Sequence, residues 1–221
     1  MGGLLSFFSF LKSKPSADEL LLSFAEQQHW SSLQLSALGM LPPSHAKEDM
    51  HGLRLSNPPS CGGRAFASTM GERLAPLTIS HLEMSLSDTE SEVYDVLSWS
   101  LSAPGTRRVE IEVGASVWNH HRLANRFDPE NSVSKKSPAG PLLRCSRAFN
   151  VAQLAKLQAS PQLLKLQAMG DQLRSGFAIE CEHTTATLFT RTVLSAREPN
   201  RWQILLDAAR CVDQMLLETL S

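Results

Sequence analysis

The chain opens with an apolar segment at helical spacing. Within residues 1–15, a helix would present one apolar stripe, formed by Leu4, Phe7, Phe8 and Leu11. The apolar run is far shorter than the roughly 20 residues that cross a bilayer. Its basic residues follow it, whereas a secretory signal peptide carries them before its apolar run. We therefore expect neither a transmembrane helix nor a signal peptide, but an arm that lies on a membrane surface.

An N-terminal helix and a linker are expected next. Residues 16–38 begin with Ser16 and Glu19, which match the S-x-x-E capping box that precedes many helices, and an apolar face follows as far as about Gln28. Residues 39–76 then carry proline and glycine at a density that breaks helical and strand patterns alike. This density predicts a long loop or a flexible linker.

The first regular part of the core is predicted as strand, helix, strand. Residues 77–86 alternate apolar and polar side chains, with an irregularity near Ser80. Residues 88–101 place valines and leucines at helical spacing after acidic residues that suit a first turn. Residues 107–118 alternate apolar with charged or small side chains, which is typical of a strand with one buried face.

The rest of the core domain, which we place at residues 77–221, contains further helices and strands. In order, we expect an exposed loop over 119–141, a short strand over 142–149, two short helices that begin at Asn150 and Pro161, a hairpin from Gly176 to Leu194, and a long helix from about Pro199. The predicted fold class is α+β. One mixed or antiparallel sheet is packed by helices, with a long C-terminal helix and a flexible N-terminal arm.

Two further features of the arm are typical of proteins anchored at a membrane. Gly2 and Ser6 match the M-G-x-x-x-[ST] pattern of N-myristoylation. Lys12 and Lys14 follow the apolar stripe, and one acyl chain needs such a second signal for stable anchoring. We expect acylation at Gly2 and lipid contact through the stripe and the two lysines. The alternative is that the arm packs on the domain and that Gly2 is coincidental.

Composition and charge narrow the class of protein. Of the 221 residues, 42% are hydrophobic and 19% are charged, which is typical of a chain that buries a core. The formal net charge of -1 argues against a dedicated or sequence-specific nucleic-acid binder. Positive charge is nevertheless in excess between Gly105 and Lys165. The expected basic patch consists of Arg122, Arg126, Lys135, Lys136, Arg144 and Arg147.

The sequence offers little catalytic chemistry. The four cysteines are far apart, without a CxxC pair or zinc-ligand spacing, so we expect a reduced intracellular protein without a metal site or a cofactor. None of the common nucleotide, hydrolase, metalloprotease or kinase motifs is present. The candidates for an enzyme are Cys61, in the apparent loop "SCGGR", and carboxylates such as Glu110 and Glu112.

A resemblance to a viral family lies in the order of elements. An apolar and basic N-terminal segment, a strand, helix and strand through "TISHLEMSLSDTESEVYDVLSWSLS" and "VEIEVGASV", and a later hairpin and helix resemble matrix proteins of non-segmented negative-strand RNA viruses. Residues 94–97, "YDVL", resemble the YxxL motif with which some viral structural proteins recruit budding machinery. The chain departs from that family in its near-neutral charge and in having no PPxY motif.

These observations favour a non-enzymatic structural or adaptor protein that acts peripherally at the cytoplasmic face of a membrane. The resemblance implies a more specific role as a virion matrix protein, with a nucleoprotein or further copies of itself as partners. The second hypothesis is an intracellular α+β domain without a membrane role. The third is a small enzyme that uses the loop cysteine or the carboxylates.

Overall fold

A computed structural model defines the fold. It describes residues 15–33, 61–68, 74, 77–85, 91–101, 106–114, 132–135, 143–146, 149–191 and 200–220. Within these ranges the elements are α1 (Ala17–Gln27), β1 (Ser31–Leu33), β2 (Cys61–Ala67), β3 (Leu77–Ser85), β4 (Ser91–Ser100), β5 (Thr106–Val113), β6 (Ser132–Lys135), β7 (Leu143–Ser146), α3 (Val151–Ala159), α4 (Pro161–Leu173), β8 (Phe177–His183), β9 (Thr185–Arg191) and α5 (Arg201–Leu220).

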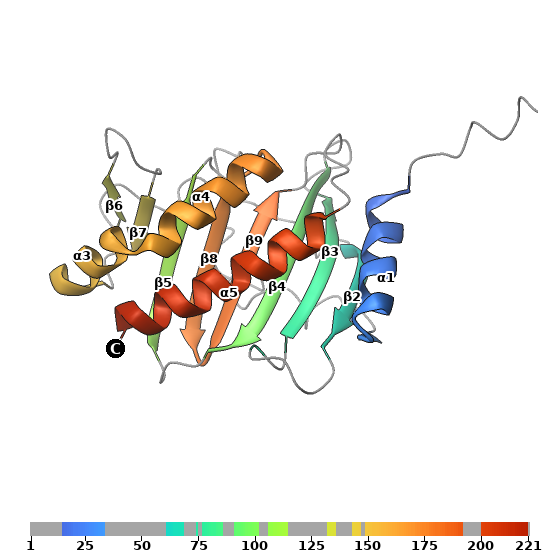
Figure 1. Ribbon diagram of the computed structural model, residues 1–221, viewed down its shortest axis with the longest axis horizontal. Coiled ribbons are helices and arrows are strands. Elements are labelled where there is room, and N and C mark those ends of the chain that lie inside the picture. Colours follow the sequence, from blue (N-terminus) through green and yellow to red (C-terminus); the bar gives the residue numbers. More distant parts are fainter. Residues whose placement is uncertain are drawn as a thin grey trace, which may run out of the picture.

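All the described strands belong to one antiparallel sheet. Their order is β1-β2-β3-β4-β9-β8-β5-β7-β6 (Figure 1). The hairpin β8–β9 is inserted between β4 and β5, so strands that are distant in the sequence become neighbours. The sheet runs from the N-terminal strands at one edge to β6 and β7 at the other. The α+β fold class predicted from the sequence is therefore confirmed.

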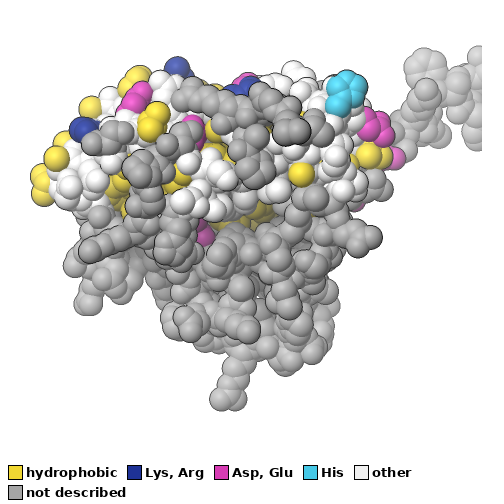
Figure 2. All heavy atoms as spheres, turned by 90° about the horizontal axis from the view of Figure 1, so that it is seen from below, with side chains coloured by type: hydrophobic (Ala, Val, Ile, Leu, Met, Phe, Trp, Pro, Cys, Tyr) yellow, Lys and Arg dark blue, Asp and Glu magenta, His cyan; other side chains and the backbone are white. Residues whose placement is uncertain are grey.

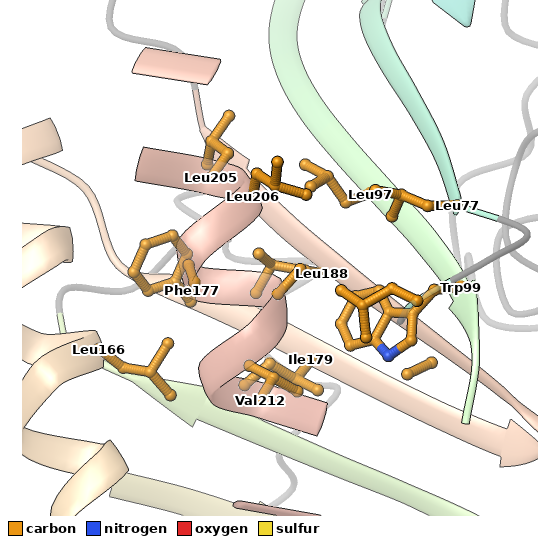
Figure 3. Packing of buried hydrophobic residues seen from close by; sticks show 14 of the residues in the cluster. Leu77, Leu97, Trp99, Leu166, Phe177, Ile179, Leu188, Leu205, Leu206 and Val212 are labelled. Atoms are coloured by element: carbon orange, nitrogen blue, oxygen red, sulfur yellow. The ribbon is translucent and has the colours of Figure 1, made fainter. Parts of the chain in front are cut away.

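The helices cover one face of this sheet. Figure 1 shows α5 running diagonally across the central strands, with α4 beside it and α3 at the β6–β7 end. Helix α1 packs against β2 and β3 near the opposite end. In Figure 3, side chains of α5 such as Leu205 and Val212 lie among Leu97, Ile179 and Leu188 of the sheet. This interface is the centre of the hydrophobic core.

Several predicted elements are confirmed by their local signals. The Ser16 hydroxyl accepts from the Glu19 backbone N–H, and the Glu19 carboxylate accepts from the Ser16 N–H, which completes the predicted capping box of α1. Asn150 caps α3 in the same reciprocal way with Gln153. Strands β3 and β7, the hairpin β8–β9 and the long helix α5 also lie where the patterns predicted them.

The helix predicted over residues 88–101 is wrong, because Ser91–Ser100 is strand β4. Leu97 and Trp99 face the helices, while Tyr94 and Val96 on the other face are buried as well. A strand buried on both faces reads as a nearly continuous apolar run, and such a run also contains helical spacings. The order strand, helix, strand, which carried part of the viral resemblance, is therefore not the observed order.

Two predicted loops contain strands. Cys61–Ala67, inside the expected linker of residues 39–76, pairs with β3, and the pairing outweighs the turn preference of its two glycines. Ser132–Lys135, inside the expected loop of residues 119–141, pairs with β7 as a short edge strand. The irregularity expected near Ser80 is absent from the β3 register and occurs in β5 between Thr106 and Val109.

Candidate functional site

Most residues predicted to form sites lie outside the described residues. This applies to Gly2, Leu4, Phe7, Phe8, Leu11, Lys12 and Lys14 of the arm, and to Arg122, Arg126, Lys136 and Arg147 of the basic patch. Lys135 and Arg144 are placed by their backbone on β6 and β7, one register step apart. The structure therefore brings these two basic positions to the same edge of the sheet.

The most polar group of side chains inside the described fold is a buried cluster of His81, Asp95 and Arg201. His81 on β3 and Asp95 on β4 are directly opposite one another in the strand register. Both face the helices, because Leu97 and Trp99, two and four residues after Asp95, belong to the core under α5. Arg201 is the first residue of α5. Two strands and one helix terminus thus meet at a single carboxylate.

In this cluster, each oxygen of the Asp95 carboxylate has its own partner. Nδ1 of His81 lies 2.6 Å from one carboxylate oxygen of Asp95, and Nε of Arg201 donates to the other oxygen. The Asp95 side chain has 0% exposure, whereas His81 retains 13%. The indole of Trp202 meets the His81 ring edge to face, with ring centroids 6.1 Å apart. Only the imidazole therefore reaches the surface of the protein.

Electrostatics keep Asp95 ionised. Burial raises the pKa of its carboxyl group, but the charge of Arg201, together with the hydrogen bond and charge of His81, lowers that pKa by more. The net pKa is below the ordinary value of 3.8. A buried carboxylate paired in this way holds its neighbours in one arrangement, since each partner would leave it with uncompensated charge if it moved.

A second polar contact joins the same strand and the same helix. The indole N–H of Trp99 donates to Oδ1 of Asp213 over 3.3 Å, and both side chains are buried. Asp95 and Trp99 are four residues apart on β4, while Arg201 and Asp213 lie twelve residues apart on α5. Two polar contacts thus fix the position of α5 along the sheet, which apolar packing alone specifies less strictly.

The thiols of Cys181 and Cys211 are poor nucleophiles. Burial, with added repulsion from the charges of Glu180 and Asp213, raises the pKa of Cys181. Burial also raises the pKa of the half-buried Cys211, although Lys165 partly opposes this rise. Cys61, the expected loop thiol, stands at the start of β2 opposite Met84, so the prediction of a loop cysteine is wrong.

Sequence reasoning missed the buried cluster. Its clearest signal is Asp95, an acidic residue inside the apolar run "VYDVL", since a charge in a buried strand needs a partner. The partners could not be identified from spacing, because His81 and Arg201 come from segments 14 and 106 residues away. Glu112, one of the two candidate catalytic carboxylates on β5, is buried on the sheet face opposite the helices.

In the part of the chain that the structure describes, no group of three or more His, Cys, Asp or Glu side chains is arranged to hold a metal ion. No helix there is long and apolar enough to cross a membrane. Comparison of the chain with protein-family models, curated proteins and solved structures finds no match.

Proposed function

We propose that this protein is a non-enzymatic adaptor held at the cytoplasmic face of a membrane by its N-terminal arm. The observation that carries the proposal is the arm's sequence, in which an acylation pattern at Gly2 precedes an apolar stripe and the lysines Lys12 and Lys14. A single acyl chain binds a bilayer only marginally, so the aromatic residues and the lysines supply the additional affinity.

The contacts within the folded domain are consistent with an arm that binds the membrane and a domain that folds separately from it. The capping box of Ser16 and Glu19 starts α1 through local contacts, directly after the arm. The Asp95 carboxylate binds both His81 and Arg201, which suits a role in holding β3, β4 and α5 together. A structural role for the cluster favours an adaptor over an enzyme.

Mass spectrometry of the N-terminus tests the proposal in the protein's own host. We expect the mature chain to lack Met1 and to carry a C14 acyl group on Gly2. A Gly2→Ala variant should lose this group and move to the soluble fraction of the cell. A retained methionine, or an unmodified or acetylated glycine, would remove the acylated form of the proposal.

Deletion of residues 2–14 tests the arm as a whole. The deleted protein should leave the membrane fraction and still unfold in one cooperative thermal transition, because α1 begins with its own cap. Loss of the transition would show that the arm belongs to the core, in which case the second hypothesis, a domain without a membrane role, would replace the first.

The resemblance to matrix proteins adds a more specific version, in which copies of the protein line a membrane and contact a nucleoprotein. It rests on the N-terminal segment and on the later hairpin and helix, since residues 91–100 form a strand. Chemical cross-linking on vesicles would test it. Ladders of cross-linked copies that appear only with membrane support the matrix version, and monomers alone contradict it.

A further inference from the structure

The outer surface of α3 and α4 is unusually apolar for exposed helices. Among the described residues, the large hydrophobic side chains that stand exposed are Val151, 87% accessible, and Leu164, 61% accessible, and both lie on these two helices. On α4 the buried residues include Leu163, Leu166 and Leu173, so helical geometry turns Leu164 almost directly away from the core. Leu164 is therefore an outward side chain, not a frayed part of the core.

The outer surfaces of the other helices differ. The exposed residues of α5 are Arg210, Gln214 and Glu218, and Arg210 donates to Asp207 of the same helix over 2.9 Å. Those of α1, such as Glu19 and Glu26, are polar as well. In Figure 2, yellow side chains are gathered at the end of the molecule where α3 lies, with basic and acidic side chains among them, and acidic side chains lie at the end where α1 lies.

The apolar surface also carries positive charge. Lys156, Lys165 and Arg174 are exposed on or directly after α3 and α4, and none of them forms an ion pair with another described residue. The exposed carboxylate there, Asp171, accepts a hydrogen bond from Gln167 of its own helix. We call the surface formed by Val151, Leu164, Lys156, Lys165 and Arg174 the α3–α4 face.

Two further basic positions lie at the β6–β7 end of the sheet, where α3 lies. Lys135 lies on the edge strand β6 and Arg144 on its neighbour β7, which leads into α3.

We propose that the α3–α4 face is a second membrane contact, which binds anionic lipid headgroups and orients the domain that the arm tethers. The inference rests on the proposed function and extends it from anchoring to orientation. Exposed apolar side chains flanked by lysines and arginines are the composition of surfaces that lie in the headgroup region. The excess of positive charge favours an anionic bilayer over a neutral one.

The test uses the full-length chain and two kinds of vesicle, phosphatidylcholine alone and phosphatidylcholine with phosphatidylserine. The double variant Lys156→Gln and Lys165→Gln should bind the anionic vesicles about 25-fold more weakly at low salt, since each basic residue near such a surface contributes about fivefold. Binding to neutral vesicles should not change. Arg210→Gln, on the exposed side of α5, is the matched control and should bind both like the unmodified chain.

A variant of the arm separates this inference from the proposed function. Phe7→Ser with Phe8→Ser should weaken binding to both kinds of vesicle, because it removes apolar insertion and not charge. If only the arm variant loses affinity, the α3–α4 face is not a lipid contact and the inference is overturned, a result that leaves the face to a protein partner or to solvent. If only the lysine variant loses affinity, the inference stands and the proposed anchoring by the arm fails.

Discussion

In folded proteins, charged side chains are usually exposed and large apolar side chains are usually buried, and Asp95 and Leu164 are exceptions of opposite kinds. Asp95 is a charged side chain in the interior, and Leu164 is a large apolar side chain at the surface. The interior exception is resolved within the fold, since His81 and Arg201 bind both carboxylate oxygens. Leu164, in contrast, is not covered by any of the described residues. The comparison suggests that the cluster serves the fold, whereas the α3–α4 face serves something outside it.

This difference gives opposite expectations for substitutions. A change in the cluster should cost stability, because it exposes a buried charge to an apolar environment. A change on the α3–α4 face should leave stability almost unaltered and alter binding, because exposed side chains contribute little to packing.

Arg201→Met should have the largest effect on stability. It keeps the aliphatic stem and removes the charge that binds Oδ2 of Asp95, so we expect a loss of about 3–5 kcal/mol in the free energy of unfolding. Urea denaturation followed by circular dichroism measures this loss. Arg210→Met, on the exposed side of the same helix, should change stability by less than about 0.5 kcal/mol. Equal stabilities of the two variants would show that the cluster contributes little.

Acid should weaken the cluster. The pKa of Asp95 is lower in the folded protein than its ordinary value of 3.8, so the folded state binds this proton less readily than the unfolded state. The stabilisation from Asp95 is therefore complete above about pH 4 and is lost as the pH falls below 3.8 toward the folded-state pKa. Urea midpoints of the unmodified chain and of Asp95→Asn should converge over that range. A gap that stays constant from pH 5 to pH 2 would contradict the lowered pKa.

Trp99→Phe should have a smaller effect than Arg201→Met. It retains an aromatic ring in the core and removes the N–H that Asp213 accepts, which should cost about 1–3 kcal/mol. Thermal denaturation measures the loss. Trp202→Phe is a suitable comparison, because the contact between Trp202 and His81 is an edge-to-face ring contact and not a hydrogen bond. A smaller loss for Trp99→Phe than for Trp202→Phe would argue against the second polar contact.

Arg174→Gly should change stability and binding in opposite directions. Arg174 ends α4 with a φ of 54°, in the left-handed region that glycine adopts without strain, so the variant should gain about 1 kcal/mol of stability. The same variant loses one cation of the α3–α4 face and should bind anionic vesicles about fivefold more weakly. His29→Gly, at φ 56° after α1, is the control for binding, because it removes no lysine or arginine and should bind anionic vesicles like the unmodified chain.

Leu164→Gln should have the smallest effect on stability, within about 0.5 kcal/mol, because the side chain is exposed on the side of α4 away from the core. Its binding to anionic vesicles should nevertheless fall, since an apolar contact with the headgroup region is lost. Leu163→Gln, one residue earlier and buried, should lower the thermal midpoint strongly. If both substitutions destabilise the fold equally, Leu164 belongs to the core.

The sequence predicted elements well where local signals decide the structure. The capping residues Ser16 and Asn150 marked the two helix starts at which they are found. The sequence-based predictions were wrong where pairing with distant strands decides the local structure. Strand β4 takes its conformation from β3 and β9, the latter about 90 residues later in the chain, and its burial on both faces hides the period-two pattern. Glycines 62 and 63 are held in β2 by the same kind of distant pairing.

The two candidate sites also differ in how far local sequence patterns could indicate them. The α3–α4 face could have been noticed, because Leu164 breaks the helical pattern of Leu163, Leu166 and Leu173 within one helix. The cluster could not, since no local pattern in the sequence links His81 with Asp95 or either of them with Arg201. The arm and most of the basic patch lie outside the described residues, so their roles stay predictions.

Binding of the full-length protein to vesicles of increasing phosphatidylserine content is the most direct test of the central claim. At low salt, affinity should rise steeply with the anionic fraction, and added salt should reduce it, because exposed charges are screened beyond about 8 Å at physiological ionic strength. A weaker, salt-independent affinity for neutral vesicles should remain, owing to the apolar residues of the arm. No binding to either kind of vesicle, or affinity that does not respond to lipid charge, would contradict the account.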